Sequence, residues 1–394
     1  MLPPLRLKKN EDRRLRAGHL WVFSNEVDVA RTPLTAFEPG QPVAVEDHRG
    51  APLGAAYVNP RSLIAARLVG RDPARPLDGA LLRERLARAL ALRERLFPGP
   101  FYRLAFGEGD GLPGLVVDRF GGVLVAQLTT AGMERLRGEV VAALAETARP
   151  AGILLRNDVP GRTLEGLEPY VEVAHGEVPE RAELEENGVR FRAPVSGGQK
   201  TGWFYDHRMN RARMQAYAPG RRVLDVFSYV GGWGVQAAAA GAAEVLCVDS
   251  SEPALAAARE NADSNGVGER VRTRRGDAFD VLRALAEEGE RFDVVVLDPP
   301  AFIKRKKDQK AGEEAYRRLA QHGMQVLAPD GILVSASCSY HMSREALHDA
   351  LLRAGRRLGR DLQLLEEGMQ GPDHPVHPAI PETRYLKAFV ARVA

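Results

Sequence analysis

The sequence predicts an α/β protein whose C-terminal half forms a doubly wound, mostly parallel sheet. Strand-length apolar segments alternate with segments of helical period from about residue 190 to the end of the chain. The first of these strands runs into a turn that contains Gly231, Gly232 and Gly234, and an acid or a pair of prolines follows several later strands. Because ligands of such sheets lie beyond the carboxyl ends of the strands, these turns form the candidate site.

Two further parts precede this sheet. Residues 1–70 combine short apolar segments of period two, such as residues 21–27, with Gly and Pro turns, which indicates a small β-rich domain. Residues 71–189 form a central α/β domain that opens with an amphipathic helix at 79–97. Residues 190–394 then form the sheet domain.

The central domain should contain β-hairpins and one further helix. Its glycine-rich stretch at 107–121 lacks the lysine and hydroxyl residue of a phosphate loop, so a hairpin is favoured. The remaining expected elements are strands within 112–128, 152–159 and 170–176 and a helix at 132–148.

The sheet domain should alternate regularly between strands and helices, because right-handed crossovers place helices on both faces. The expected strands are 223–228, 244–249, 270–274, 292–297 and 331–336, the helices are 233–240, 252–264, 279–288, 312–326 and 343–356, and a strand pair near 362–366 and 385–393 closes the sheet.

Composition excludes several classes of protein. With 394 residues, 44% of them hydrophobic, the chain is expected to be globular. Its net charge of +3 is too small to indicate a polyanionic partner from overall charge alone. No apolar run reaches membrane-spanning length and no signal peptide is evident, so we expect a cytoplasmic protein without a membrane partner. Two cysteines argue against a disulfide framework. His341, His374 and His377 lack partners at ligand spacing, so no metal is expected.

Two local runs of positive charge stand out. Residues 6–16 carry six arginines and lysines, and Lys304–Lys307 reads KRKK. Either run can be a solvated surface or a contact for phosphates. The second lies beside the candidate site, which favours a functional role for it.

The turn after the first strand does not have the G-x-G-x-x-G spacing that a dinucleotide requires. A ligand without phosphates, such as S-adenosylmethionine, fits better. Asp249, at the end of the second strand, can accept hydrogen bonds from both ribose hydroxyls, although it could instead cap the helix that follows. Asp277, after the third strand, can accept from an adenine amino group. Asp225 more readily supports the loop.

Residues 298–302 read DPPAF, and two prolines at a strand end make a rigid ledge. Asp298 can then face a planar substrate that carries an amino group, with Phe302 available to stack on it. The alternative is a purely structural strand terminator.

Cys338 ends another buried strand, and the residues after it are expected to begin a helix. The positive N-terminal end of that helix would favour a thiolate. Cys247 lies inside an apolar strand and is expected to be a core residue.

Several longer motifs together resemble the large-subunit ribosomal RNA cytosine-5 methyltransferases of the class I fold. The motifs are GQKTGWFYDHRMNR at 198–211, LDVFSYVGGWG at 224–234, LDPPAF at 297–302, SCSYH at 337–341 and DHPVHPAIPETRYLK at 373–387. RRLRAGHLWVFSNEV at 13–27 resembles the start of that family's PUA RNA-binding domain, and 107–121 resembles its central domain. The sequence departs from the family's usual residues at Trp203 and Trp233, often Phe, and at Tyr205-Asp206-His207, often Leu-Asp-Gln; we expect these changes to be tolerated near the cofactor pocket.

The resemblance implies a Rossmann-like class I methyltransferase domain behind a PUA-like domain and a central α/β module. It also implies that the Cys338 thiolate adds to C6 of cytosine while Asp298 holds the base, and that S-adenosylmethionine is the cofactor. Arg211 is a further candidate for contact with cofactor or RNA phosphate. The expected cofactor contacts are Gln199, Lys200, Phe227, Ser228, Tyr229, Gly231, Asp249, Ser250, Asp277, Ala278 and Asp298.

The implied partner is ribosomal RNA of the large subunit or its precursor, and a homodimer stays open as the assembly. Two other functions also stay open. A methyltransferase of the same fold could modify guanine or a base nitrogen, with Cys338 structural. A non-catalytic RNA-binding assembly factor could instead have kept the cofactor pocket.

Overall fold

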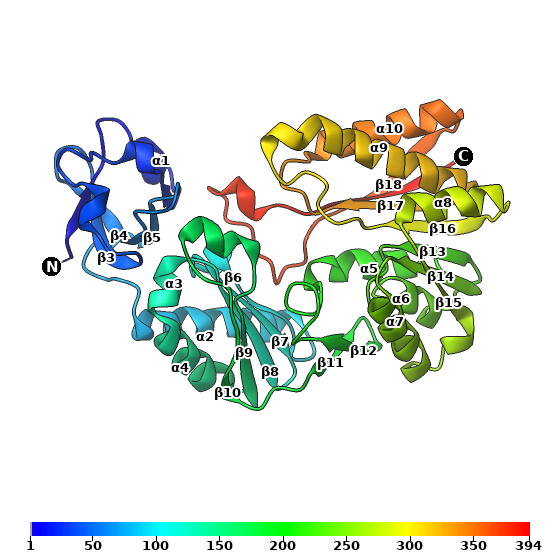
Figure 1. Ribbon diagram of the computed structural model, residues 1–394, viewed down its shortest axis with the longest axis horizontal. Coiled ribbons are helices and arrows are strands. Elements are labelled where there is room, and N and C mark those ends of the chain that lie inside the picture. Colours follow the sequence, from blue (N-terminus) through cyan, green and yellow to red (C-terminus); the bar gives the residue numbers. More distant parts are fainter. Residues whose placement is uncertain (1) are drawn as a thin grey trace. The chain divides into compact units, whose positions relative to one another are not determined.

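The computed structural model describes residues 2–394, which form two compact units (Figure 1). The first unit contains residues up to 182 together with the segments Pro194–Tyr205 and Pro372–Thr383. The second contains Glu183–Ala193, Asp206–Gly371 and Arg384–Ala394. The chain therefore passes between the units several times.

The N-terminal part of the first unit is a five-stranded sheet in the order β1-β3-β4-β5-β2. Apolar residues alternate along β3 and are nearly continuous along β4 and β5, and they meet in a core that includes Leu5, Val43 and Val45. This confirms the expected β-rich segment. Within the apolar segment 21–27, two residues pair as a strand and a 3-10 turn follows at Ser24–Glu26. The elements are β1 (Pro4–Arg6), α1 (Arg13–Arg16), β2 (Trp21–Val22), β3 (Gln41–Glu46), β4 (Pro52–Val58) and β5 (Ala66–Gly70).

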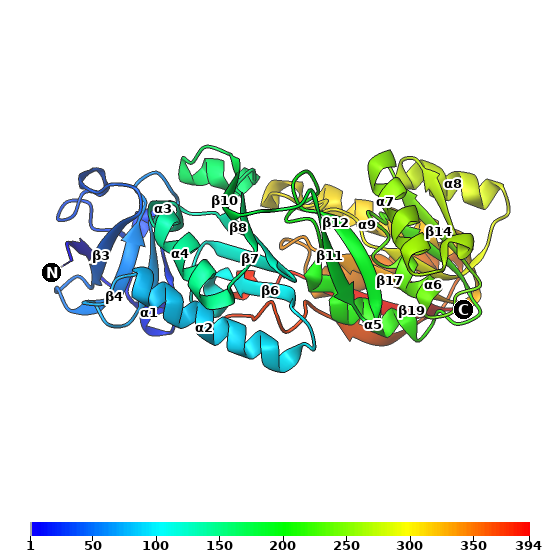
Figure 2. The same cartoon turned by 90° about the horizontal axis from the view of Figure 1, so that it is seen from below.

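The central part of the first unit is a second five-stranded sheet, ordered β10-β9-β8-β7-β6, with helices α2 and α4 packed side by side (Figure 2). The glycine-rich stretch forms a hairpin, as expected, because β6 and β7 pair antiparallel on either side of it. The elements are α2 (Gly79–Leu96), β6 (Phe101–Phe106), β7 (Leu115–Phe120), β8 (Val123–Leu128), α3 (Ala131–Arg135), α4 (Arg137–Ala148), β9 (Gly152–Arg156) and β10 (Val171–Gly176).

The single helix expected at 132–148 was wrong, because the chain leaves helical geometry at Leu136 and forms α3 and α4. The break lets α3 pack on β3, β4 and β8 while α4 packs on α2 and β10. The α3 contact is close: a side chain at Gly132 would lie 2.3 Å from the ring of Tyr57.

A buried carboxylate joins the two sheets of the first unit. Glu165 ends a 3-10 turn, Pro160–Glu165, and accepts hydrogen bonds from Asn59, Ser62 and Arg67 of the N-terminal part at 2.8, 2.8 and 2.9 Å. Three donors satisfy one buried acid, so the desolvation cost of each group is offset.

The second unit contains a seven-stranded sheet in the order β15-β14-β13-β16-β17-β19-β18. Its first five strands are parallel, and β19 runs antiparallel to both β17 and β18. This is the predicted doubly wound Rossmann-like sheet. The strands are β13 (Arg222–Val226), β14 (Glu244–Asp249), β15 (Val271–Arg275), β16 (Phe292–Leu297), β17 (Leu327–Ser337), β18 (Leu362–Gly368) and β19 (Lys387–Val393), and a separate hairpin is formed by β11 (Arg181–Glu186) and β12 (Val189–Pro194).

Helices cover both faces of this sheet (Figure 1). Alternate residues of the strands, such as Leu224 and Val226 of β13, share one core with α8, α9 and α10, whereas α6 and α7 pack on the opposite face. This arrangement follows from right-handed crossovers between parallel strands. The helices are α5 (Arg208–Gln215), α6 (Gly234–Ala239), α7 (Glu252–Ser264), α8 (Ala278–Glu287), α9 (Gln309–Gln325) and α10 (Arg344–Leu358).

Replacing Glu165 should destabilise the first unit, because Glu165→Ala leaves the buried Arg67 without its nearest carboxylate. We expect a loss of about 3 kcal/mol in the free energy of unfolding, measured by urea denaturation of the full chain. Glu38→Ala is the matched control, since its ion pair with Arg135 is exposed, and should change stability by less than about 0.5 kcal/mol. Equal effects of the two variants would contradict a structural role for Glu165.

Candidate active site

The candidate site lies at the carboxyl edge of the parallel strands in the second unit. The strand order reverses between β13 and β16, and the loops after these two strands diverge to opposite sides of the sheet. Such a switch point forms a crevice where ligands of open α/β sheets bind.

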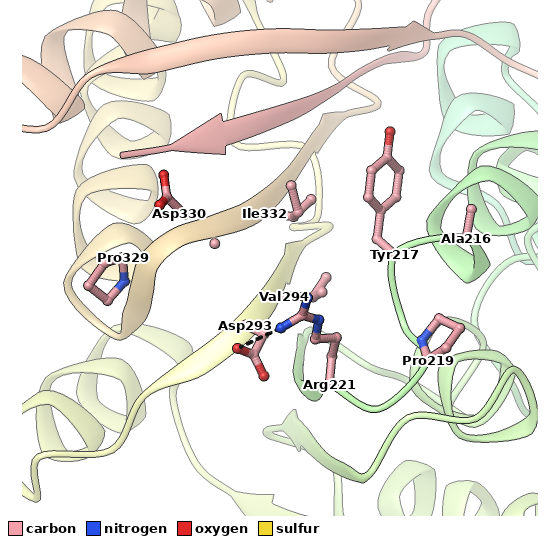
Figure 3. Close-up of a pocket in the computed structure, with 10 residues that line it drawn as sticks. Ala216, Tyr217, Pro219, Arg221, Asp293, Val294, Pro329, Asp330 and Ile332 are labelled. Carbon is pink, nitrogen blue, oxygen red and sulfur yellow. Dashed lines mark ion pairs between the residues drawn. The ribbon is translucent and has the colours of Figure 1, made fainter.

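A surface cavity lies at the opposite edge, where β13, β16 and β17 begin (Figure 3). Arg221 and Asp293 lie 3.9 Å apart there, with Tyr217 and Asp330 across the cavity. None of the residues expected from the sequence to bind cofactor or substrate lines it.

The loop after β13 is held by the buried carboxylate of Asp225, which accepts a hydrogen bond from the Gly234 amide at 2.8 Å. Phe227, Tyr229 and Gly231 all have positive φ, at 67°, 49° and 84°. Such angles are costly for the two aromatic residues and persist only where surrounding contacts impose them. The expectation that Asp225 supports the loop is confirmed.

Small residues are required in this loop. A Cβ atom at Gly234 would lie 2.5 Å from the Cys247 sulfur and 3.1 Å from an oxygen of Asp225. Only glycine therefore lets the start of α6 approach β13 and β14 this closely. Cys247 is buried in β14, as expected for a core residue, and burial raises the pKa of its thiol.

Asp249 ties the same loop to the neighbouring strand. Its carboxylate accepts the Tyr229 amide and the Ser251 amide, each at 2.9 Å. Helix α7 is capped by the Ser251 hydroxyl, so the alternative that Asp249 is the N-cap was wrong. Ser250 is exposed beside it.

Asp277 caps α8, with its carboxylate accepting from the Phe279 and Asp280 amides at 2.9 and 3.3 Å. The side chain is otherwise exposed, while the next residue, Ala278, is buried. Three half-buried aromatic residues, Phe227, Phe279 and Phe302, lie close by. The ring centroid of Phe302 is 6.4 Å from that of Phe279 and 6.5 Å from that of Phe227. They form an apolar wall beside the acids.

Asp298, directly after β16, is fixed through both carboxylate oxygens. Trp233 donates its indole N–H to Oδ2 at 3.0 Å, and His207 Nε2 lies 3.1 Å from Oδ1. Burial by itself raises the pKa of Asp298, but His207, Trp233 and Arg211 together lower it below its usual range. The carboxylate is therefore held ionised and oriented.

Sequence reasoning assigned no role to these two donors. His207 and Trp233 are two of the positions that depart from the family pattern, and the structure brings both onto Asp298. The only sequence signal for a shared partner was that both residues differ from the family's usual residues, in two motifs that are separated in the chain.

Cys338 follows β17 and is partly exposed. The Tyr316 hydroxyl joins its two neighbours, since the Ser337 hydroxyl donates to it at 2.8 Å and the Ser339 hydroxyl lies 3.1 Å away. The helix expected at 343–356 forms as α10, which begins at Arg344 and is capped by Ser343, so its N-terminus is separated from Cys338 by a turn. The helix dipole acts only over the first turn, so it does not account for a thiolate at Cys338.

Gln199 and Lys200 are exposed and belong to the first unit, in the segment Pro194–Tyr205. The Lys200 amine lies 4.3 Å from the centroid of the Phe204 ring. The second unit does not include them.

Arg211 is buried and donates to Glu186 at 2.6 Å, with its guanidinium 5.8 Å from the centroid of the Trp233 ring. Its contact with the cofactor or an RNA phosphate stays a prediction, and in this structure its charge is paired with Glu186.

The two basic runs differ. In the first, Arg6, Arg14 and Arg16 form ion pairs with carboxylates of the same unit at 2.7, 2.6 and 2.5 Å. Much of the positive charge of this run is therefore neutralised within the unit. In the second, Lys304, Lys306 and Lys307 are exposed and keep their charge at the surface.

The residues at this edge fit S-adenosylmethionine. Asp249, Asp277 and Asp298 present acceptors at the ends of three strands, and the aromatic wall lies between them. S-adenosylmethionine offers donors and positive charge that match this set: ribose hydroxyls, an amino group on adenine, an ammonium and a sulfonium. A phosphate would face acidic repulsion here.

The sheet order, the glycine loop and the acids at the strand ends define a methyltransferase that uses S-adenosylmethionine. Residues 167–392 match the S-adenosylmethionine-dependent methyltransferase family, and residues 5–71 match a PUA-like domain. Ribosomal RNA large subunit methyltransferase I of Cronobacter sakazakii is 37% identical over 392 residues, covering 98% of each chain. The Klebsiella pneumoniae protein of that name is 36% identical over 401 residues, covering 100% of this chain and 99% of its own. The chain therefore belongs to the ribosomal RNA large subunit methyltransferase I family.

Solved structures agree on the fold. A candidate S-adenosylmethionine-dependent methyltransferase from Streptococcus mutans superposes with a TM-score of 0.83 at 20% identity, covering 99% of this chain and all of that one. A second candidate methyltransferase, solved with S-adenosylhomocysteine, gives a TM-score of 0.84 at 20% identity and the same coverage. Within residues 2–394, no helix combines the length and apolarity needed to cross a membrane.

Gly234→Ala should weaken binding of S-adenosylmethionine at least about tenfold, because the added methyl group displaces the loop from Cys247 and Asp225. Isothermal titration calorimetry with the full chain measures the affinity. Gly138→Ala is the control, since open space surrounds that position, and it should bind like the parent. Unchanged affinity in Gly234→Ala would refute the loop's role.

Asp225 should make stability depend on pH. Burial raises the pKa of Asp225 to about 7, so the folded protein holds a proton there between about pH 4 and pH 7, where the unfolded chain has lost it. The free energy of unfolding should therefore fall as pH rises through this window. Asp225→Asn keeps an acceptor for the Gly234 amide but has no carboxyl group to titrate. Between about pH 5 and about pH 7.5, the free energy of unfolding of this variant, measured by urea denaturation, should fall less than that of the parent. Parallel profiles would contradict this assignment.

Proposed function

We propose that this protein methylates C5 of a cytidine in large-subunit ribosomal RNA through a covalent adduct with Cys338. The name of the curated relatives supports the RNA substrate. The observation that carries the chemistry is the placement of Cys338 and Asp298. They follow adjacent parallel strands, with Leu297 paired to Ser335, at the edge that carries the methyl-donor loop.

Carbon 5 of cytosine is too weak a nucleophile to be methylated directly, which is why a thiolate is needed. The Cys338 sulfur adds to C6 and forms a C–S bond, the ring takes up a proton at N3, and C5 becomes an enamine carbon. S-adenosylmethionine supplies the methyl group as an electrophile. Loss of the C5 proton then restores the C5–C6 double bond, breaks the C–S bond and returns the thiolate of Cys338, and N3 gives its proton back to solvent.

Asp298 suits the recognition of cytosine. Its oxygens are already oriented by Trp233 and His207, and each keeps a lone pair that can accept from the exocyclic amine. His207 Nε2 lies within hydrogen-bond distance of Oδ1 and keeps the carboxylate oriented for the base. The aromatic side chain of Phe302 lies on the same turn and can stack on the base.

The domain division supports an RNA substrate. We assign residues 1–70 to RNA binding by the PUA-like domain, 71–189 to the central domain, and 190–394 to catalysis. A base within a helix must be extruded to reach Cys338, and the exposed lysines at 304–307 can contact the flanking phosphates.

The test is Cys338→Ala, which removes the nucleophile and should lower methylation of large-subunit ribosomal RNA by at least about a thousandfold. Binding of S-adenosylmethionine should persist, because Cys338 does not support the donor loop. RNA containing 5-fluorocytidine should trap the parent protein as an adduct that survives denaturing electrophoresis. Cys247→Ala, the matched thiol control, should still form that adduct.

The outcomes separate the rival functions. Full activity of Cys338→Ala would replace this proposal with methylation at a base nitrogen or at guanine. Failure of the parent protein to bind S-adenosylmethionine would point to a non-catalytic assembly factor. Mapping 5-methylcytidine in ribosomal RNA from a strain without the protein identifies the target nucleotide.

A further inference from the structure

The amine of Lys387 lies beside Cys338. Strand β19 pairs antiparallel with β17 so that Lys387 is opposite Ser337, the residue before the cysteine. The Lys387 amine donates to the carbonyl of Ser339, the residue after the cysteine, at 2.7 Å, and to the Tyr385 carbonyl at 2.9 Å. Two backbone carbonyls therefore hold the amine of Lys387 next to the backbone that carries Cys338.

The environment of Lys387 makes it able to exchange a proton near neutral pH. The residue is half-buried, and burial lowers the pKa of its amine to about 8. The negative charge of the Cys338 thiolate raises the pKa of Lys387, and the positive charge of Arg384 lowers it. An exposed lysine would remain an ammonium ion at neutral pH and could not act as a base.

The proposed reaction requires a base on the side of the ring that faces Cys338. If the methyl group adds to C5 from the face opposite the sulfur, the C5 hydrogen is left on the face of the sulfur. The base must then come from the surroundings of Cys338 itself.

Other groups at this edge are less suited. Asp298 is assigned to the exocyclic amine of the base, and the lowered pKa of its carboxyl makes it a weak base. The Tyr316 hydroxyl is buried between Ser337 and Ser339, and burial raises the pKa of Tyr316. Cys247, the second thiol, is buried in β14.

We propose that Lys387 is the general base that removes the C5 proton, and that as an ammonium ion it first stabilises the Cys338 thiolate. This inference rests on the proposed cytosine-5 chemistry. It assigns a catalytic role to a residue on the antiparallel strand β19, outside the parallel strand ends where the other site residues lie.

The charges balance through the cycle. The resting pair is a thiolate and an ammonium ion. Formation of the C6–S bond removes the negative charge that held the proton on Lys387, so the ammonium ion releases that proton to solvent. After the methyl group has been transferred to C5, the neutral amine takes the proton from C5, the electrons of the C5–H bond restore the C5–C6 double bond, and the C6–S bond breaks. The proton that N3 took up during addition returns to solvent. Thiolate and ammonium ion are both regenerated.

Lys387→Arg tests this role, because a guanidinium keeps the positive charge beside Cys338 but cannot act as a base. The variant is incubated with unmodified substrate RNA and S-adenosylmethionine. We expect methyl transfer to stop at about one methyl group per protein molecule, and the RNA to remain covalently attached to the protein on a denaturing gel. The adduct should form only when S-adenosylmethionine is present. Lys310→Arg, on the exposed surface of α9, is the matched control and should turn over like the parent without accumulating adduct.

Two outcomes would overturn the assignment. The first is multiple turnover by Lys387→Arg at the parent rate. The second is accumulation of the adduct by His341→Gln, a change on the turn after Cys338, but not by Lys387→Arg. Failure of the underlying chemistry is distinguishable, because the parent protein would then form no adduct with 5-fluorocytidine RNA. Circular dichroism and S-adenosylmethionine binding verify that Lys387→Arg is folded, and a misfolded variant is replaced by Lys387→Gln, for which the same accumulation is expected.

Discussion

The hydrogen bond from the Gly234 amide to the buried carboxylate of Asp225 is the constraint on which the site depends. It draws the start of α6 against the end of β13, so the intervening loop must turn sharply and accept positive φ at Phe227 and Tyr229. Asp249 then takes the Tyr229 amide and fixes the loop to the next strand. Asp225 and Asp249 thus hold the same strained loop at two points, the Gly234 amide and the Tyr229 amide. A loop fixed in this way presents its backbone to a ligand without first having to order itself, which lowers the cost of binding.

Two acids of this site have pKa values shifted in opposite directions by their surroundings. Asp225 is fully buried with one backbone donor, and burial raises its pKa to about 7. Asp298 is half-buried, and His207, Trp233 and Arg211 outweigh the effect of desolvation and lower its pKa. Carboxylates whose environments push their pKa values apart commonly have different roles. Here Asp225 supports the loop, whereas Asp298 is held ionised, as its proposed role as an acceptor for the base requires.

Most of the sheet could be predicted from the sequence, because parallel strands buried on both faces are continuous apolar runs and their ends are marked by Asp249, Asp277 and Asp298. Periodicity could not reveal the break at Leu136, which follows from packing against two different surfaces. It did locate α10, which was expected at 343–356 and spans Arg344–Leu358. The sequence also could not reveal the contacts of Asp298 with His207 and Trp233. Both residues lie far from Asp298 in the sequence, and only the fold brings them together. Local patterns therefore located the elements and the acids, while the partners that set their chemistry required the structure.

The pairing of Lys387 with Cys338 gives the proposed reaction an inherent order. While the sulfur is a thiolate, its negative charge keeps the proton on Lys387, so the amine cannot act as a base too early. Once the C6–S bond forms, that charge is gone and the remaining influences, burial and Arg384, both favour the neutral amine. The base therefore becomes available only after the nucleophile has been consumed. Nucleophile and base are thus coordinated by one pair of residues, because the half-buried amine of Lys387, held by two backbone carbonyls, changes its proton affinity with the state of the sulfur.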